Sequence, residues 1–99
     1  MKVKIDEKLL DVRGKEIVKP GDIEPFMTLR GVCIGSVLHP TTEDDEKIKY
    51  QRYEIYKKLR DAEIQVELTI EELATIKKCI GQLQPPLIMG QAFEMLEGK

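Results

Sequence analysis

The sequence of 99 residues lacks an excess of positive charge. Sixteen Lys and Arg residues stand against eighteen Asp and Glu residues, and the formal net charge is −2. Proteins that bind nucleic acid without sequence preference use clustered cations to neutralise phosphates and release counterions. The composition therefore argues against nucleic acid as a partner, and only a local basic patch would oppose that expectation.

The sequence also lacks a long hydrophobic run. The longest one, Val32–Leu38, is interrupted by Gly35 and is far shorter than the roughly 20 residues of a membrane-spanning helix. Charged residues occupy Met1–Glu7, where a signal peptide would have an apolar segment. We therefore expect no membrane segment and a cytoplasmic protein, in which Cys33 and Cys79 stay reduced.

Residue types suited to metal binding or catalysis are sparse. The sequence contains one histidine, His39, and two cysteines, Cys33 and Cys79, and none of them has a second Cys or His at ligand spacing. No pair of carboxylates is singled out by its spacing for acid–base catalysis. We interpret the three residues as structural or incidental, and we expect no enzyme, no cofactor and no metal ion.

One segment approaches the pattern of a calcium-binding loop, namely residues 61–72. Its acidic and amide side chains lie near the ligand positions of such a loop: Asp61, Glu63, Gln65, Glu67 and Glu72. However, Val66 stands where the loop needs a glycine, and a β-branched residue resists the sharp turn. We therefore interpret the segment as a plain helix–strand–helix connection.

The sequence does contain a set of capped, amphipathic segments. The clearest is a helix over residues 70–82, because Thr69 and Glu72 have the spacing of a capping box. Its apolar residues follow the helical period and should face a core: Leu73, Ile76, Ile80 and Leu83. Similar cues of capping, charge and periodicity predict helices over residues 28–38, 43–60 and 87–97.

Extended structure is predicted near the N-terminus. β-prone residues flank a glycine and indicate a β-hairpin that turns near Arg13–Gly14 and closes at Pro20–Gly21, with a loop over residues 22–27. Residues 64–68 alternate between apolar and polar types and form a candidate third strand. Because the length suits one core, we predict a single α+β domain over residues 1–99, in which the hairpin packs with the four helices.

Two tyrosines are the first candidates for a protein-interaction surface. Tyr50 and Tyr53 lie off the apolar stripe of their predicted helix, and Arg52 and Lys49 lie beside them. Aromatic residues and Arg are enriched among the residues that dominate interface energetics. The alternative, which the sequence leaves equally open, is that the hairpin folds over the tyrosines.

Two further sets of residues are candidates for contact with a partner. Gly31 and Gly35 lie one helical turn apart and would let another backbone approach closely, either at an intramolecular crossing, which we expect, or at a dimer contact. Met89 and Phe93 widen the apolar arc of the last helix. We expect this arc to be buried in the core, and adaptable partner binding is the alternative.

The sequence resembles small proteins encoded by tailed bacteriophages and prophages. The likeness spans nearly the whole chain and rests on four stretches: Leu-Leu-Asp-Val-Arg-Gly-Lys-Glu-Ile from Leu9, Thr-Leu-Arg-x-Val from Thr28, Val-Glu-Leu-Thr-x-Glu-Glu-x-Ala-x-Ile-Lys-Lys from Val66, and Pro-Leu-Ile-x-Gly-Gln-x-x-x-x-Leu-Glu from Pro86. The resemblance carries over no catalytic residue. It implies a bacterial cytoplasm during phage growth, where small acidic proteins typically act by binding other proteins.

We therefore hypothesise a non-enzymatic protein-interaction module, such as a phage accessory factor in assembly or host modulation. Its partner would be a phage or bacterial protein. Homo-oligomerisation is also expected, because the helices over residues 28–38 and 87–97 carry more apolar surface than one short core readily covers. The alternative is a sequence-specific DNA-binding regulator, since a chain of short helices can contain a helix-turn-helix. An enzyme ranks third.

Overall fold

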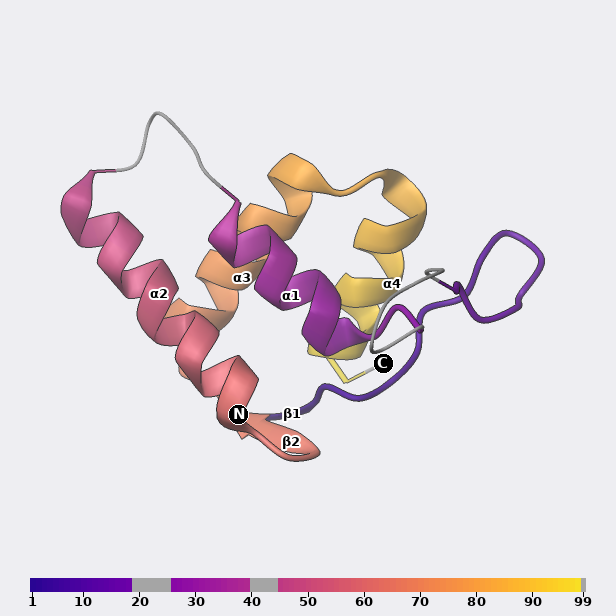
Figure 1. The fold of residues 1–99 in the computed structure, drawn as a ribbon, viewed down its shortest axis with the longest axis horizontal. Helices are drawn as coiled ribbons and strands as arrows, with labels where there is room; N and C mark the ends of the chain where they lie inside the picture. Colours follow the sequence, from indigo (N-terminus) through magenta and orange to yellow (C-terminus); the bar gives the residue numbers. More distant parts are fainter. Residues whose placement is uncertain (19–25, 40–44, 99) are drawn as a thin grey trace.

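A computed structural model describes residues 1–18, 26–39 and 45–98 (Figure 1). These residues form two strands and four helices, in the order β1 (Lys2–Lys4), α1 (Leu29–Leu38), α2 (Glu46–Asp61), β2 (Gln65–Glu67), α3 (Ile70–Leu83) and α4 (Pro86–Leu96). Helix α1 packs against α2, α3 and α4. The predicted α+β class and the four predicted helices are confirmed.

The helix ends follow the local cues in the sequence. At the start of α3 the backbone N–H of Glu72 donates to Thr69 Oγ1 at 3.1 Å and the Thr69 N–H donates to Glu72 Oε1 at 2.9 Å, which is the predicted capping box. Thr28 caps α1, and the α4 helix starts at Pro86. None of the helices in the described ranges has the length and apolarity needed to cross a membrane.

Helix α2 begins with a side-chain cap from Asp45, whose carboxylate accepts the Ile48 N–H at 2.8 Å. It ends at Asp61, one residue after the predicted end. The predicted opening of this helix at residues 41–43 lies outside the described residues. Acidic Glu46 lies in the first turn and basic Lys58 in the last turn, where each charge interacts favourably with the helix dipole, as the charge pattern indicated.

The strand predicted over residues 64–68 forms as β2, and its antiparallel partner is β1. Val3 pairs with Val66 in the centre of the ladder. The predicted hairpin turn is also present: Gly14 has a φ of 78°, which glycine adopts readily, and the Asp11 N–H donates to Lys15 O at 2.7 Å. Isolated bridges, such as Leu10 with Glu16, join the arms of the hairpin. Its predicted closure at residues 20–21 and most of the predicted loop lie outside the described residues.

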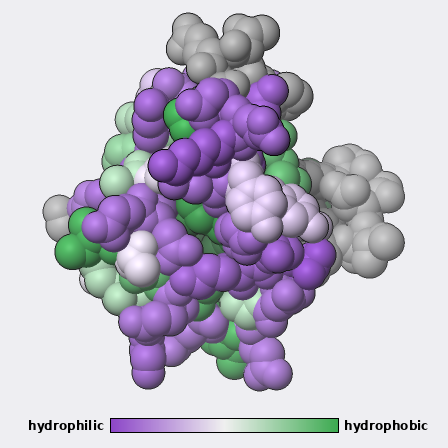
Figure 2. Space-filling view, turned by 90° about the vertical axis from the view of Figure 1, so that its left-hand side faces the viewer, coloured by the Kyte–Doolittle hydropathy of each residue, from purple (hydrophilic) through white to green (hydrophobic). Residues whose placement is uncertain are grey.

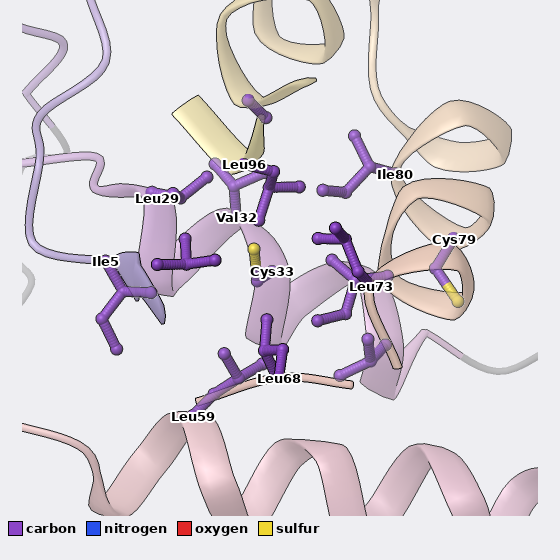
Figure 3. Close-up of a cluster of buried hydrophobic side chains, with 14 of the residues drawn as sticks. Ile5, Leu29, Val32, Cys33, Leu59, Leu68, Leu73, Cys79, Ile80 and Leu96 are labelled. Carbon is purple, nitrogen blue, oxygen red and sulfur yellow. The ribbon is translucent and has the colours of Figure 1, made fainter. Parts of the chain in front are cut away.

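The hydrophobic core lies where the helices and β1 meet (Figure 3). Labelled side chains from α1, α2, α3 and α4 lie around this volume, together with Ile5 and Leu68, which directly follow β1 and β2. Ile5, Leu29 and Leu59 have no exposed surface. The predicted buried stripe of α3 is confirmed for Leu73, Ile76 and Ile80. Leu83, at the end of that stripe, is 38% exposed because the helix ends beside it.

A buried arginine joins α2 to the end of α1. Arg52 is 7% exposed, and its Nε donates to the carbonyl oxygen of Val37 at 2.8 Å. Its Nη2 donates to the carbonyls of Ser36 at 3.2 Å and His39 at 2.6 Å. The last carbonyls of a helix have no partner within the helix, so Arg52 acts as a C-terminal cap for α1 supplied by α2. The prediction that Arg52 belongs to an outward surface is therefore wrong.

A second arginine makes the reciprocal connection. Arg30, in the first turn of α1, donates from Nη1 to the carbonyls of Leu59 at 3.2 Å and Arg60 at 3.3 Å, near the end of α2. The same guanidinium donates to the carbonyl of Glu63 and pairs with Asp6 Oδ1 at 3.1 Å. Each of the two helices thus caps the C-terminal end of the other, and this exchange fixes α2 relative to the core.

Candidate protein-interaction surface

Three tyrosines form a row along the outward side of α2. The ring centroids of Tyr50 and Tyr53 are 6.3 Å apart, and those of Tyr53 and Tyr56 are 6.0 Å apart, with tilted planes. Tyr50 is 62% exposed and Tyr53 is 46% exposed, whereas Tyr56 is partly buried against the core. We call these residues the tyrosine row. It presents aromatic surface on a helix whose other face is anchored by Ile55 and Leu59.

Basic side chains lie over two of the three tyrosine rings. Lys57 Nζ lies 5.3 Å from the centroid of Tyr53, and Arg60 Cζ lies 5.4 Å from that of Tyr56. Both distances fall in the range of cation–π attraction. Because the cations sit one helical turn after the rings they cover, the arrangement is built into the sequence of α2 itself.

Tyr50 has a different neighbour. A hydrogen bond with the carboxylate of Glu54 raises the pKa of Tyr50, and the same bond, together with one from Lys57, lowers the pKa of Glu54. Glu54 also pairs with Lys57 at 3.3 Å. The hydroxyl of Tyr50 therefore remains protonated near neutral pH and can act as a hydrogen-bond donor.

Charges of both signs alternate around the tyrosine row. Arg60 pairs with Asp61 at 2.8 Å, and Lys58 pairs with Glu72 of α3 at 2.7 Å. Figure 2 shows the side of the molecule on which α2 lies, where hydrophilic residues dominate and hydrophobic ones are visible in small areas between them. These ion pairs leave α2 with a mixed-sign surface, in contrast to the uninterrupted row of cations that would suit a phosphate backbone.

The part of the hairpin that the structure describes does not cover the tyrosines, which are exposed, so that alternative is wrong. The turn around Gly14 lies at the opposite end of the molecule from α2 (Figure 1). It is attached to α4, because the Leu10 N–H donates to Gln91 Oε1 at 2.8 Å and Gln91 Nε2 donates back to Leu10 O at 2.7 Å. Tyr50 and Tyr53 are thus open to a partner on the side that faces away from the hairpin.

The expected intramolecular crossing at Gly31 and Gly35 is also wrong for the described part of the chain. A Cβ atom placed on Gly35 would meet nothing within 4 Å, and one on Gly31 would meet only Thr28 Oγ1 of its own helix at 3.6 Å. Both glycines are exposed, and Leu38, one turn further, is 47% exposed. The close packing of α1 instead uses the opposite face, which carries Cys33.

Met89 and Phe93 are partly buried and pack against the core, as expected. Lys77 of α3 lies over the ring of Phe93, with its Nζ 5.3 Å from the centroid. The exposed apolar residue of this helix is Leu87 in its first turn, at 40%. Most of the apolar arc of α4 is therefore used within the fold.

The remaining polar candidates have structural roles. Cys33 is fully buried, and burial raises the pKa of its thiol to about 12, so the thiol stays protonated. Cys79 is also buried, and the carbonyl of His39 accepts a bond from Arg52. Among the residues that the structure describes, no three His, Cys, Asp or Glu side chains are grouped so as to hold a metal ion.

The segment from residue 61 to residue 72 adopts the helix–strand–helix connection that the sequence indicated. Val66 lies in β2 and is buried against the core. Burial alone would raise the pKa of Glu72, but the hydrogen bonds from Lys58 and from the Thr69 backbone outweigh it and lower that pKa. The carboxylate of Glu72 is thus committed to capping α3 and to pairing with α2.

Sequence reasoning missed a groove between α2 and α3. It has a volume of about 230 Å³ and is lined by Tyr50, Gln51, Glu54, Ile55, Glu71, Glu72 and Thr75. The groove begins at the exposed end of the tyrosine row. The sequence contains one sign that α2 and α3 lie near each other, namely the opposite charges of Lys58 and Glu72, which form an ion pair between the two helices.

Comparison with known proteins adds no relative from which a function can be transferred. The chain matches no protein-family model, no curated protein and no solved structure.

Proposed function

We propose that this protein is a non-enzymatic protein-interaction module and that the tyrosine row of α2 is its contact surface. The observation that carries the proposal is the exposure of Tyr50 and Tyr53 side by side on a helix that the core and Arg52 hold in place. Tyrosine offers a large contact area with few rotatable bonds, so ordering it on binding costs little entropy. Such residues dominate the energetics of many interfaces.

The charge distribution supports a protein partner over DNA. Two of the basic residues of α2 that flank the tyrosines are engaged with carboxylates, in the pairs Lys57–Glu54 and Arg60–Asp61. A helix that reads DNA needs cations free for phosphates and polar side chains free for base edges. A mixed-sign surface with exposed aromatic rings suits the rim and centre of a protein interface.

The biological setting is proposed from the resemblance alone. Small phage and prophage proteins of similar pattern imply a bacterial cytoplasm, a phage or bacterial protein as partner, and an accessory role in assembly or host modulation. Such a role needs a stable fold and a specific contact surface, with no catalytic group. The compact core and the exposed tyrosine row support this proposal.

The proposal predicts that the tyrosines contribute to binding and little to folding. In a variant with Tyr50→Ala and Tyr53→Ala, the melting temperature should stay close to that of the parent, because both rings are exposed. The affinity for the partner should fall by more than about 1 kcal/mol, or about fivefold. Isothermal titration calorimetry with the partner, once captured and identified by mass spectrometry, measures this loss.

Val12→Ala is the matched control for that experiment, because Val12 is 85% exposed and lies in the hairpin, which is attached to α4 and not to α2. It should leave the affinity unchanged. An unfolded double variant would place the tyrosines in the fold, and equal losses from the control and the double variant would refute the tyrosine row as the contact surface.

We also propose that the chain self-associates through the outer face of α1. Gly31 and Gly35 leave this face flat, and Leu38 adds exposed apolar area to it. Light scattering should give the mass of a dimer at high micromolar concentration, and Leu38→Glu should return it to a monomer, because a buried charge would be unpaired at the contact. A strict monomer in the parent protein would refute this part of the proposal.

A further inference from the structure

The groove between α2 and α3 combines an aromatic side chain, carboxylates and an apolar base. Ile55, only 3% exposed, lies at its base, and Tyr50 with Glu54 forms the α2 side. Glu71 and Thr75 come from the facing side of α3. The groove therefore adjoins the proposed contact surface, but its chemistry differs from that of the rest of the tyrosine row.

Tyr50 is distinguished by the residue that follows it one helical turn later. Tyr53 and Tyr56 are followed at that spacing by Lys57 and Arg60, each of which lies over the preceding ring. Tyr50 is followed by Glu54, and within the described ranges no Lys or Arg lies over its ring. The row thus ends in a ring that has the same aromatic face as its neighbours and no cation of its own.

The carboxylates of the groove also differ in whether a basic side chain pairs with them. Glu54 pairs with Lys57, and Glu72 pairs with Lys58. Glu71 is exposed and makes no ion pair with any residue that the structure describes. A cation placed in the groove would therefore meet an aromatic ring on the α2 side and an uncompensated carboxylate on the α3 side.

We propose that this groove receives an arginine side chain from the partner protein. The inference rests on the proposed function, since it names the chemistry by which the partner is recognised. The guanidinium stacks on the ring of Tyr50 and pairs with the carboxylate of Glu71. Arginine fits better than lysine, because its planar, weakly hydrated guanidinium can stack on a ring and donate to a carboxylate at the same time.

The test uses a short peptide as a probe. The ¹⁵N-labelled protein is titrated at low salt with a blocked peptide that has one arginine among glycines, and with the same peptide carrying citrulline, which keeps the shape and removes the charge. The arginine peptide should shift the amide signals of Tyr50, Glu54 and Glu71. Its affinity should exceed that of the citrulline peptide by about tenfold, as expected for one cation–π contact and one ion pair together.

Two matched pairs of variants assign the binding to the groove. Glu71→Gln should weaken the arginine peptide about threefold to fivefold, the effect expected of one exposed ion pair, whereas Glu94→Gln on α4 removes the same charge at a distance and should not. Tyr50→Ala should weaken it to a similar degree, whereas Tyr50→Phe keeps the ring and should bind as the parent does. Thermal melts of all four variants confirm that they are folded.

Several results would overturn the inference. They are equal binding of the citrulline peptide, equal losses from Glu71→Gln and Glu94→Gln, and signal shifts confined to residues outside the groove. Failure of the peptide together with a partner whose affinity still depends on Tyr50 and Tyr53 would refute arginine recognition and leave the proposed function intact. Loss of the dependence on both tyrosines would refute the proposed function itself.

Discussion

Replacing Arg52 with alanine should lower the free energy of unfolding by about 3 kcal/mol or more. The change removes the donors that serve the carbonyls of Ser36, Val37 and His39. A buried acceptor left without a donor costs about 1–3 kcal/mol, and these acceptors lose their donors together. Equilibrium unfolding in urea, followed by circular dichroism, measures the loss.

Two further variants at this position separate hydrogen bonding from charge and volume. Arg52→Met keeps most of the apolar stem and should be nearly as unstable as the alanine variant. Arg52→Lys keeps the charge but lacks the planar fork, so it should recover only part of the stability. A loss below about 0.5 kcal/mol for Arg52→Ala, typical of an exposed position, would contradict the buried cap.

The second large effect is expected in the core. Ile76 has no exposed surface and lies in the buried stripe of α3. Ile76→Ala should cost about 2–5 kcal/mol through lost burial and the cavity left behind. Because domains of this kind are stable by only about 5–15 kcal/mol in total, the variant should be partly unfolded well below the melting temperature of the parent.

Ile76→Val is the control for this experiment, since it removes a single methylene group. It should cost about 0.5–1.5 kcal/mol, and the two losses should scale with the volume removed. Urea unfolding of both variants gives the comparison. Equal and small losses from both would mean that α3 does not contribute to the core as described.

The sequence was sufficient where structure depends on neighbours along the chain. The start of α3 was predictable because the capping box of Thr69 and Glu72 involves residues three apart. The turn at Gly14 and the start of α4 at Pro86 followed from the backbone preferences of single residues. The outward position of Tyr53 followed from its angle around the helix relative to Ile55.

The errors all concern contacts between segments far apart in the sequence. The position of Arg52 beside Tyr50 and Tyr53, off the apolar stripe of its helix, predicts a surface residue, but its burial depends on where α1 ends. Gly31 and Gly35 matched a crossing motif, but no spacing rule says which face of α1 meets a neighbour. The pairing of β1 with β2 joins residues more than sixty positions apart, and periodicity predicts strands without predicting their partners.

In the candidate site, too, the features that depend on local sequence were predictable and those that depend on contacts between distant segments were not. The exposed tyrosines could be named from the sequence, yet whether the hairpin would cover them depended on its attachment to α4 through Gln91. The groove could not be foreseen, because Tyr50 and Glu71 lie on α2 and α3, two helices that are brought together by packing against α1. The pairing of a ring with a facing carboxylate is a property of the tertiary fold.

Site-specific photo-crosslinking tests most directly whether the tyrosine row is the contact surface. The photoreactive amino acid p-benzoylphenylalanine replaces Tyr53 in one sample and Glu94, an exposed residue of α4, in the other. Both proteins are irradiated in the cells that naturally make the protein, and the adducts are identified by mass spectrometry. We predict a discrete adduct with one other protein from position 53 and none from position 94. No adduct from position 53, or the same adducts from both positions, would contradict the account.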